Sequence, residues 1–114
     1  MSYNVYPTPA FKKSLKNLNK KYPSLKAELQ KLIKILKEKP DSGIHLGHGI
    51  YKIRMAITSK GKGKSGGARV ITYLITEDKE VYLVYIYDKS QLDNISKEQI
   101  IELLKKAGHK KKKN

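Results

Sequence analysis

The spacing of the apolar residues changes halfway along the chain, and this change limits the folds that are open to it. Residues 9–39 carry apolar side chains three and four positions apart, which is the period of amphipathic helices. Residues 51–58 and 69–87 alternate, or run continuously, in β-branched and aromatic residues that are typical of strands. Because most of the helical part precedes most of the β-rich part, the pattern favours an α+β domain over repeated βα units.

The first half predicts a short strand that holds Tyr3 and Val5, followed by two helices. Thr8 before Pro9 is the pattern of an N-cap residue followed by proline in the first helical turn. The apolar stripes of the two helices are Phe11, Leu15 and Leu18, and Leu25, Leu29, Leu32, Ile33 and Leu36. The KPDSG segment at residues 39–43 ends the second helix.

The second half predicts three strands and a helix. The strands cover residues 51–58, 69–76 and 81–87, and the KGKGKSGG segment at residues 60–67 predicts a flexible basic loop. Ser96 and Gln99 have the spacing of a capping box, which opens the last helix. The predicted fold is an N-terminal strand and a helical hairpin packed on a mostly antiparallel four-stranded sheet, with a C-terminal helix. We expect helices on one face of this sheet and an open second face.

A single domain is expected over residues 1–108, and the basic residues 109–114 predict a disordered tail. The chain has no cysteine, which excludes disulfides and thiol catalysis. Its first residues lack the apolar run of a signal peptide, so a cytoplasmic location is expected.

The net charge of +15, from 25 basic and 10 acidic residues, predicts a polyanionic partner. Nucleic acid fits best because its closely spaced phosphates release counterions when basic residues bind them. A membrane surface is not expected, since the chain has no tryptophan and a single phenylalanine to insert into a bilayer.

The sequence gives little support for nucleotide binding by a P-loop, for metal catalysis or for acid–base catalysis by carboxylates, and no cofactor is predicted. Gly63-Lys64-Ser65 resembles the end of a phosphate-binding P-loop, but Thr58 stands where the first glycine of that motif is needed. His45 and His48 lack the further ligands of a zinc site and are interpreted as turn or surface residues. The scattered carboxylates are interpreted as turn and surface groups.

Four basic residues are candidates for a site on the sheet. Lys52 and Arg54 are two positions apart on a strand, so their side chains share a face. Arg69 opens the next strand and Lys89 follows the third. The chain has 25 basic residues, yet its only two arginines are both in this set, which favours a need for a planar group that binds phosphate through two hydrogen bonds.

The segments LGHGIYKIR (46–54), GARVITY (67–73) and VYLVYIYDKS (81–90) together resemble the RelE/ParE superfamily of type II toxins, and most closely its RelE-like HigB branch. The resemblance implies a toxin that enters the ribosomal A site and cuts messenger RNA without a metal. In that reaction the 2′-hydroxyl attacks the adjacent phosphate. A cognate antitoxin protein would hold the toxin inactive.

The resemblance assigns Lys52 and Arg54 to the basic pair of the family, Arg69 to its phosphate-binding arginine, and Lys89 to the basic residue after the last strand. Residues 90–96 lack the late tyrosine of some members, which leaves the general acid and base open. Lys52 is our first choice as base and Lys89 is the candidate acid, because neighbouring cations favour the neutral form of a lysine.

Binding of the ribosome and RNA is predicted for Lys60, Lys62 and Lys64 through long-range attraction, and for Tyr87 through stacking on a base. Two other functions compete with the nuclease. One is a ParE-like inhibitor of DNA gyrase, which would need no phosphate clamp. The other is a noncatalytic RNA- or ribosome-binding module, which would need stacking aromatic residues on an open sheet face.

Overall fold

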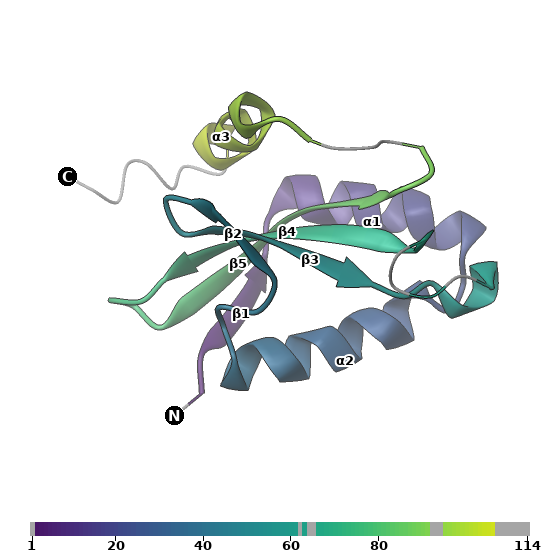
Figure 1. Ribbon diagram of the computed structural model, residues 1–114, viewed down its shortest axis with the longest axis horizontal. Coiled ribbons are helices and arrows are strands. Elements are labelled where there is room, and N and C mark those ends of the chain that lie inside the picture. The colour runs from purple at the N-terminus through teal and green to yellow at the C-terminus, as the bar shows by residue number, and fades with distance from the viewer. Residues whose placement is uncertain (1, 62, 64–65, 92–94, 107–114) are drawn as a thin grey trace.

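The computed structural model describes residues 2–61, 63, 66–91 and 95–106, and the predicted tail at 109–114 lies outside this part of the chain. The α+β class is confirmed (Figure 1). In chain order the elements are β1 (Asn4–Pro7), α1 (Pro9–Lys21), α2 (Leu25–Glu38), β2 (Ile44–Gly47), β3 (Ile50–Met55), the short 3-10 helix η1 (Thr58–Lys60), β4 (Ala68–Ile75), β5 (Glu80–Asp88) and α3 (Lys97–Lys106).

The sheet has five strands in the order β1-β5-β4-β3-β2, not the four that the sequence predicted. β1 pairs with β5 in parallel and the other three pairings are antiparallel, so the sheet is mostly antiparallel as expected. The missed strand is β2, whose four residues end in glycine and pair with β3 in an irregular register. Such a short edge strand has too few residues to display an alternating pattern.

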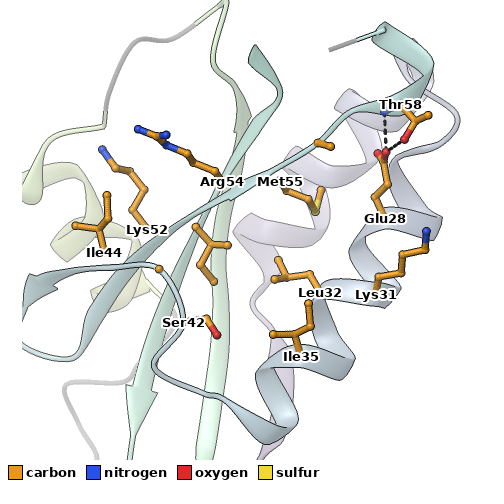
Figure 2. Close-up of a pocket in the computed structure, with 13 residues that line it drawn as sticks. Glu28, Lys31, Leu32, Ile35, Ser42, Ile44, Lys52, Arg54, Met55 and Thr58 are labelled. Atoms are coloured by element: carbon orange, nitrogen blue, oxygen red, sulfur yellow. Dashed lines mark hydrogen bonds between the residues drawn. The ribbon is translucent and has the colours of Figure 1, made fainter. Parts of the chain in front are cut away.

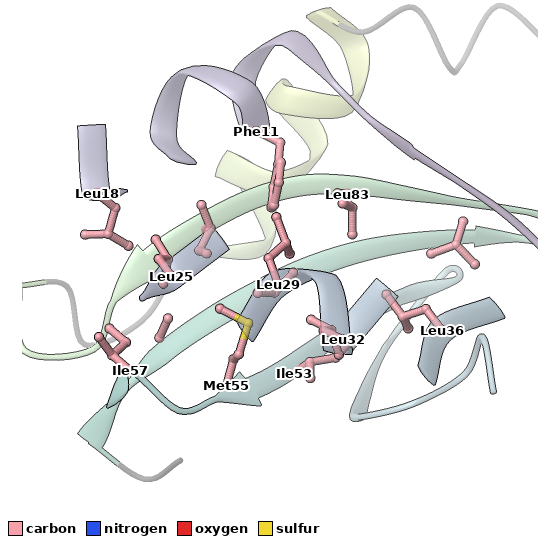
Figure 3. Packing of buried hydrophobic residues seen from close by; sticks show 14 residues of the cluster. Phe11, Leu18, Leu25, Leu29, Leu32, Leu36, Ile53, Met55, Ile57 and Leu83 are labelled. Atoms are coloured by element: carbon pink, nitrogen blue, oxygen red, sulfur yellow. The ribbon is translucent and has the colours of Figure 1, made fainter. Parts of the chain in front are cut away.

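Helices cover both faces of the sheet, which corrects the expectation of an open second face. α1 and α2 pack on one face, where Phe11, Leu29 and Leu36 meet strand residues that include Ile53 and Leu83 (Figure 3). In Figure 1, α3 and α2 lie on opposite sides of the strands. On its side, Ile100 of α3 belongs to a second buried cluster with Ile50, Ile71, Val84 and Tyr87. Those strand residues form an apolar surface that needs a cover, and α3 supplies it.

A β-bulge in β5 decides which side chains reach the α3 face. Ile71 of β4 is paired with Tyr85 and Thr72 with Leu83, so Val84 is the extra residue. Leu83 and Ile86 therefore contact the α1/α2 core, while Val84, Tyr85 and Tyr87 contact the α3 cluster. Without the extra residue, strict alternation from Leu83 would turn Tyr85 and Tyr87 toward α1 and α2.

Thr8 connects the start of α1 to this bulge. As predicted, its hydroxyl caps the helix by accepting a hydrogen bond from the Phe11 backbone N–H at 3.2 Å, and Pro9 follows in the first turn. The same hydroxyl is positioned to donate to the carbonyls of Leu83 at 3.1 Å and Val84 at 3.2 Å. One buried hydroxyl thus serves both the helix N-terminus and the carbonyl groups of the bulge.

Thr8→Val is expected to lower the free energy of unfolding by about 1–2 kcal/mol, because it removes the cap and leaves buried carbonyls without this donor. Urea unfolding followed by circular dichroism measures the effect. Thr76→Val is the matched control, since Thr76 is exposed in the turn after β4. Equal stability of the two variants would contradict this role for Thr8.

Candidate functional site

Arg54, Arg69 and Tyr87 form one row across three adjacent strands. The register pairs Arg54 of β3 with Arg69 of β4, and Arg69 with Tyr87 of β5. Directly opposed residues on antiparallel strands have β-carbons about 4.5–5.5 Å apart. The predicted meeting of the two arginines on one face is therefore found, on the face that carries α3.

Lys52 lies next to this row, two residues before Arg54 on the same strand. It is paired with Ile71, which is paired with Tyr85, so a second row runs beside the first. Figure 2 shows the Lys52 and Arg54 side chains leaving β3 on the same side, away from α2. The spacing of two strand residues puts their β-carbons about 7 Å apart, close enough for both to act on one phosphodiester group.

Lys89 follows the last residue of β5 and adds a basic residue at that end of the site. Its backbone N–H donates to the Gly67 carbonyl at 3.0 Å, which continues the β4–β5 ladder one residue past Asp88. The Asp88 side chain contacts Tyr22 at the end of α1, on the opposite face. Alternation along the strand then places Lys89 on the Arg69 side.

The two arginines differ in their environments. Arg54 is exposed, whereas only 4% of the Arg69 surface is exposed. Burial and the neighbouring Arg54 guanidinium lower the pKa of Arg69, and Tyr87 acts in the opposite direction. An Nη1 group of Arg69 donates to the Ala68 carbonyl at 3.2 Å, which helps to orient the guanidinium. A guanidinium stays charged even under such conditions, so the site holds a desolvated cation beside a solvated one.

Tyr87 is buried against the α3 cluster, with 6% of its surface exposed. Burial raises the pKa of its hydroxyl, and Arg69 opposes this shift. Stacking of Tyr87 on a base stays a prediction, and it requires the ring to become accessible. Tyr85, whose ring centroid lies 6.3 Å from that of Tyr87, is half-buried.

Lys60 occupies a structural position that the sequence did not suggest. Its Nζ lies 2.7 Å from the Asp88 carboxylate and 3.0 Å from the Ser90 hydroxyl, and it also lies over the Tyr22 ring. Asp88 in turn accepts hydrogen bonds from Ser90 and from the Tyr22 hydroxyl. Interpreting all the carboxylates as turn and surface groups was wrong for Asp88, whose side chain is fully buried.

The remaining candidate residues add no described side chain to the row of Arg54, Arg69 and Tyr87. Lys62 and Lys64 lie outside the described residues. His45 is exposed and stacks on Tyr51, and His48 lies exposed in the β2–β3 turn, as predicted for both histidines. No group of three metal-ligating side chains occurs within the described ranges. Among the described helices, none has the length and apolar character needed to cross a bilayer.

Comparison with known proteins places the chain in a family. Residues 5–114 match the family described as "RelE toxin of RelE / RelB toxin-antitoxin system". The fold is similar to a solved structure of the E. coli toxin RelE, a double arginine-to-alanine mutant in the free state. The TM-score is 0.58 at 18% sequence identity, and the alignment covers 96% of this chain and 98% of the other.

Proposed function

Because the chain belongs to the RelE family, the toxin half of RelE/RelB toxin–antitoxin systems, we propose that it is a ribosome-dependent endoribonuclease that cuts messenger RNA in the A site. The observation that carries the proposal is the cross-strand pair of Arg54 and Arg69 with Lys52 beside it. Two guanidinium groups and an ammonium group on one face match the charge that develops on a phosphodiester during cleavage.

The proposed reaction is an in-line transfer within the RNA strand. The 2′-oxygen forms a bond to the adjacent phosphorus as the bond to the 5′-oxygen breaks, which leaves a 2′,3′-cyclic phosphate and a free 5′-hydroxyl. Lys52 accepts the 2′-hydroxyl proton, and Lys89 donates a proton to the departing 5′-oxygen. Arg54, which is exposed, stabilises the negative charge on the nonbridging oxygens, and Arg69 joins it once its buried guanidinium becomes accessible. Fixed cations perform this task without a metal ion.

Cleavage of a defined mRNA, mapped at nucleotide resolution, tests this function. Purified protein is expected to cut at codons in the A site when ribosomes are present and to leave the same mRNA intact in their absence. The products are expected to carry a cyclic phosphate. Intact mRNA together with blocked supercoiling by DNA gyrase would favour the gyrase inhibitor instead.

Lys62 and Lys64 are proposed to attract ribosomal RNA, whereas Lys60 is held in its ion pair with Asp88. Changing Lys62 and Lys64 to serine is expected to weaken ribosome binding and to reduce the salt slope of log K by about 1.4, since each phosphate contact contributes about 0.7 on single strands. Cosedimentation with ribosomes over a salt series measures this slope. The cleavage rate at saturating ribosome concentration is expected to stay nearly constant, and a large loss of that rate would place the loop in the chemistry.

A further inference from the structure

The outer edge of β5 is uncovered beyond its pairing with β1. That pairing ends at Leu83, whereas β5 continues to Asp88, and within the described ranges no strand pairs with this last stretch from outside. The Ile86 N–H points to the uncovered edge, because it donates to the Ser14 hydroxyl of α1 at 3.3 Å. The Asp88 carbonyl points there as well and accepts the Gln91 N–H at 3.0 Å.

Two backbone groups on this edge remain for a ligand. The N–H and C=O of one residue in an antiparallel strand point to the same side, so the Ile86 carbonyl and the Asp88 N–H also face the uncovered edge. Neither group has a hydrogen-bond partner among the described residues. The edge thus presents one acceptor and one donor, two residues apart along the strand.

A pocket of about 270 Å³ lies between this edge and α1. Ile86, Tyr87 and Asp88 line it from β5, and Leu18 supplies an apolar wall from α1. Tyr85 also lines the pocket and is half-buried, so part of this residue is accessible. The polar lining residues come from α1 and from the segment after β5, and they are Ser14, Asn17, Lys21 and Gln91.

The charges around this pocket favour a ligand that carries phosphate. Asp88 is the one carboxylate among the described lining residues. Its side chain is fully buried and already holds the Lys60 ammonium at 2.7 Å and the Tyr22 hydroxyl at 2.9 Å, so it offers no free negative charge. Lys21 lines the pocket, and Lys89 follows the end of β5. Neutral donors and acceptors inside, with cations beside them, suit a neutral polar group on a polyanion.

We propose that this pocket binds one unpaired base of the RNA substrate. Every RNA base carries a hydrogen-bond donor beside an acceptor on its pairing edge, and this pair matches the Ile86 carbonyl and the Asp88 N–H. The side-chain amides of Asn17 and Gln91 each carry donors and an acceptor, so they can bond the remaining groups of that edge and distinguish one base from another. Tyr85 supplies an aromatic ring for stacking on the base.

The pocket adjoins the row of Arg54, Arg69 and Tyr87 on the β5 side. Tyr87 belongs to both, and the outer edge of β5 lies two strand spacings, about 10 Å, from the strand of Arg69. A base bound there belongs to a nucleotide that flanks the cleaved bond. The pocket would therefore select the sequence at which the RNA is cut, a consequence that rests on the proposed function. Binding of the base itself depends only on the pocket.

The binding test uses the isotope-labelled full-length protein and the four ribonucleoside 5′-monophosphates, followed by NMR. At least one nucleotide is expected to shift the Asp88 amide resonance, because this N–H donates to the base. Ribose 5-phosphate, which has no base, is expected to leave that resonance unchanged. Asn17→Leu is expected to weaken binding of the nucleotide about threefold to tenfold, the effect of losing one hydrogen bond. Gln30→Leu is the matched control, since Gln30 is an exposed amide on α2 and is not among the pocket residues.

Mapped cleavage of mRNA tests the selection of sequence. Asn17→Leu is expected to reduce the ratio between the most and least frequently cut codons about threefold or more, whereas Gln30→Leu is expected to keep the wild-type ratio. An unchanged ratio in Asn17→Leu would overturn the role in selection. The base site is overturned if no nucleotide shifts the Asp88 amide more than ribose 5-phosphate does, or if Asn17→Leu and Gln30→Leu bind nucleotide equally. The NMR measurements contain no ribosome or mRNA, so nucleotide binding by a protein that cuts no mRNA would reject the proposed function and retain the base site.

Discussion

Arg69→Ala is expected to slow ribosome-dependent mRNA cleavage by about 10²–10³-fold, the range found when one preorganised donor to a developing negative charge is removed. Arg69 is the residue of the site whose guanidinium is both desolvated and oriented. It is buried between Arg54 and Tyr87 in the row and donates to the Ala68 carbonyl. Electrostatic interactions of a desolvated cation are stronger than those of an exposed one.

The form of the kinetic loss distinguishes catalysis from ribosome binding. If Arg69 stabilises the transition state, the single-turnover rate at saturating ribosome concentration falls while the concentration needed for half-saturation changes little. Arg69→Lys keeps the charge but loses the planar fork, so an intermediate rate is expected. Lys12→Ala is the matched control, since Lys12 is an exposed cation on α1.

Protein stability must be measured beside the rate. Arg69→Ala removes the repulsion from Arg54 but also leaves a space within the sheet, so the melting temperature can move in either direction. A variant that stays folded at the assay temperature and cuts at the wild-type rate would contradict the role of Arg69. A loss as small as that of Lys12→Ala would do the same.

Local signals in the sequence predicted much of this fold. Thr8 and Pro9 mark the start of α1, and the capping box of Ser96 and Gln99 forms as predicted, through hydrogen bonds of 3.0 and 3.1 Å. The spacing of two between Lys52 and Arg54 was enough to put both side chains on one face. Each of these features depends on residues within a few positions of one another, which a periodic pattern can record.

The missed features depend on residues far apart in the chain. Val84 becomes a bulge because of how β5 pairs with β4, and no residue within β5 marks it. Because the sequence does not reveal this bulge, it could not predict that Tyr87 faces Arg69. The partner of Lys60 is Asp88, 28 positions later, so a lysine in a basic loop gave no sign that it forms a buried ion pair. Pairings of this kind arise from tertiary packing, which leaves no period in the sequence.

Lys60→Met is expected to lower the free energy of unfolding by about 3–5 kcal/mol, because it leaves the buried Asp88 carboxylate without its counterion. The side chain of Asp88 is 0% exposed and that of Lys60 is 15% exposed, so water can replace little of the lost interaction. The pair also joins η1 to the end of β5. Urea unfolding near neutral pH measures the loss.

Two further variants separate the ion pair from the general effect of losing a lysine. Lys26→Met removes an exposed cation from α2 and is expected to change stability by less than about 0.5 kcal/mol. Adding Asp88→Asn to Lys60→Met removes the uncompensated charge, so the double variant is expected to be more stable than Lys60→Met alone. Additive losses in the double variant would show that the two side chains do not interact.

The pH dependence of stability gives an independent test of the same pair. Burial would raise the pKa of Asp88, but hydrogen bonds from Lys60, Ser90 and Tyr22 outweigh it and lower the pKa from 3.8 to about 2. A carboxyl whose pKa is lower in the folded state stabilises the fold above its unfolded pKa, and this contribution is lost as the pH falls through about 2. Without Lys60 the folded pKa of Asp88 rises, so Lys60→Met is expected to unfold at a higher pH than the wild type during acid titration. Coincident acid transitions for the two proteins would mean that Lys60 does not hold Asp88 in its ionised form.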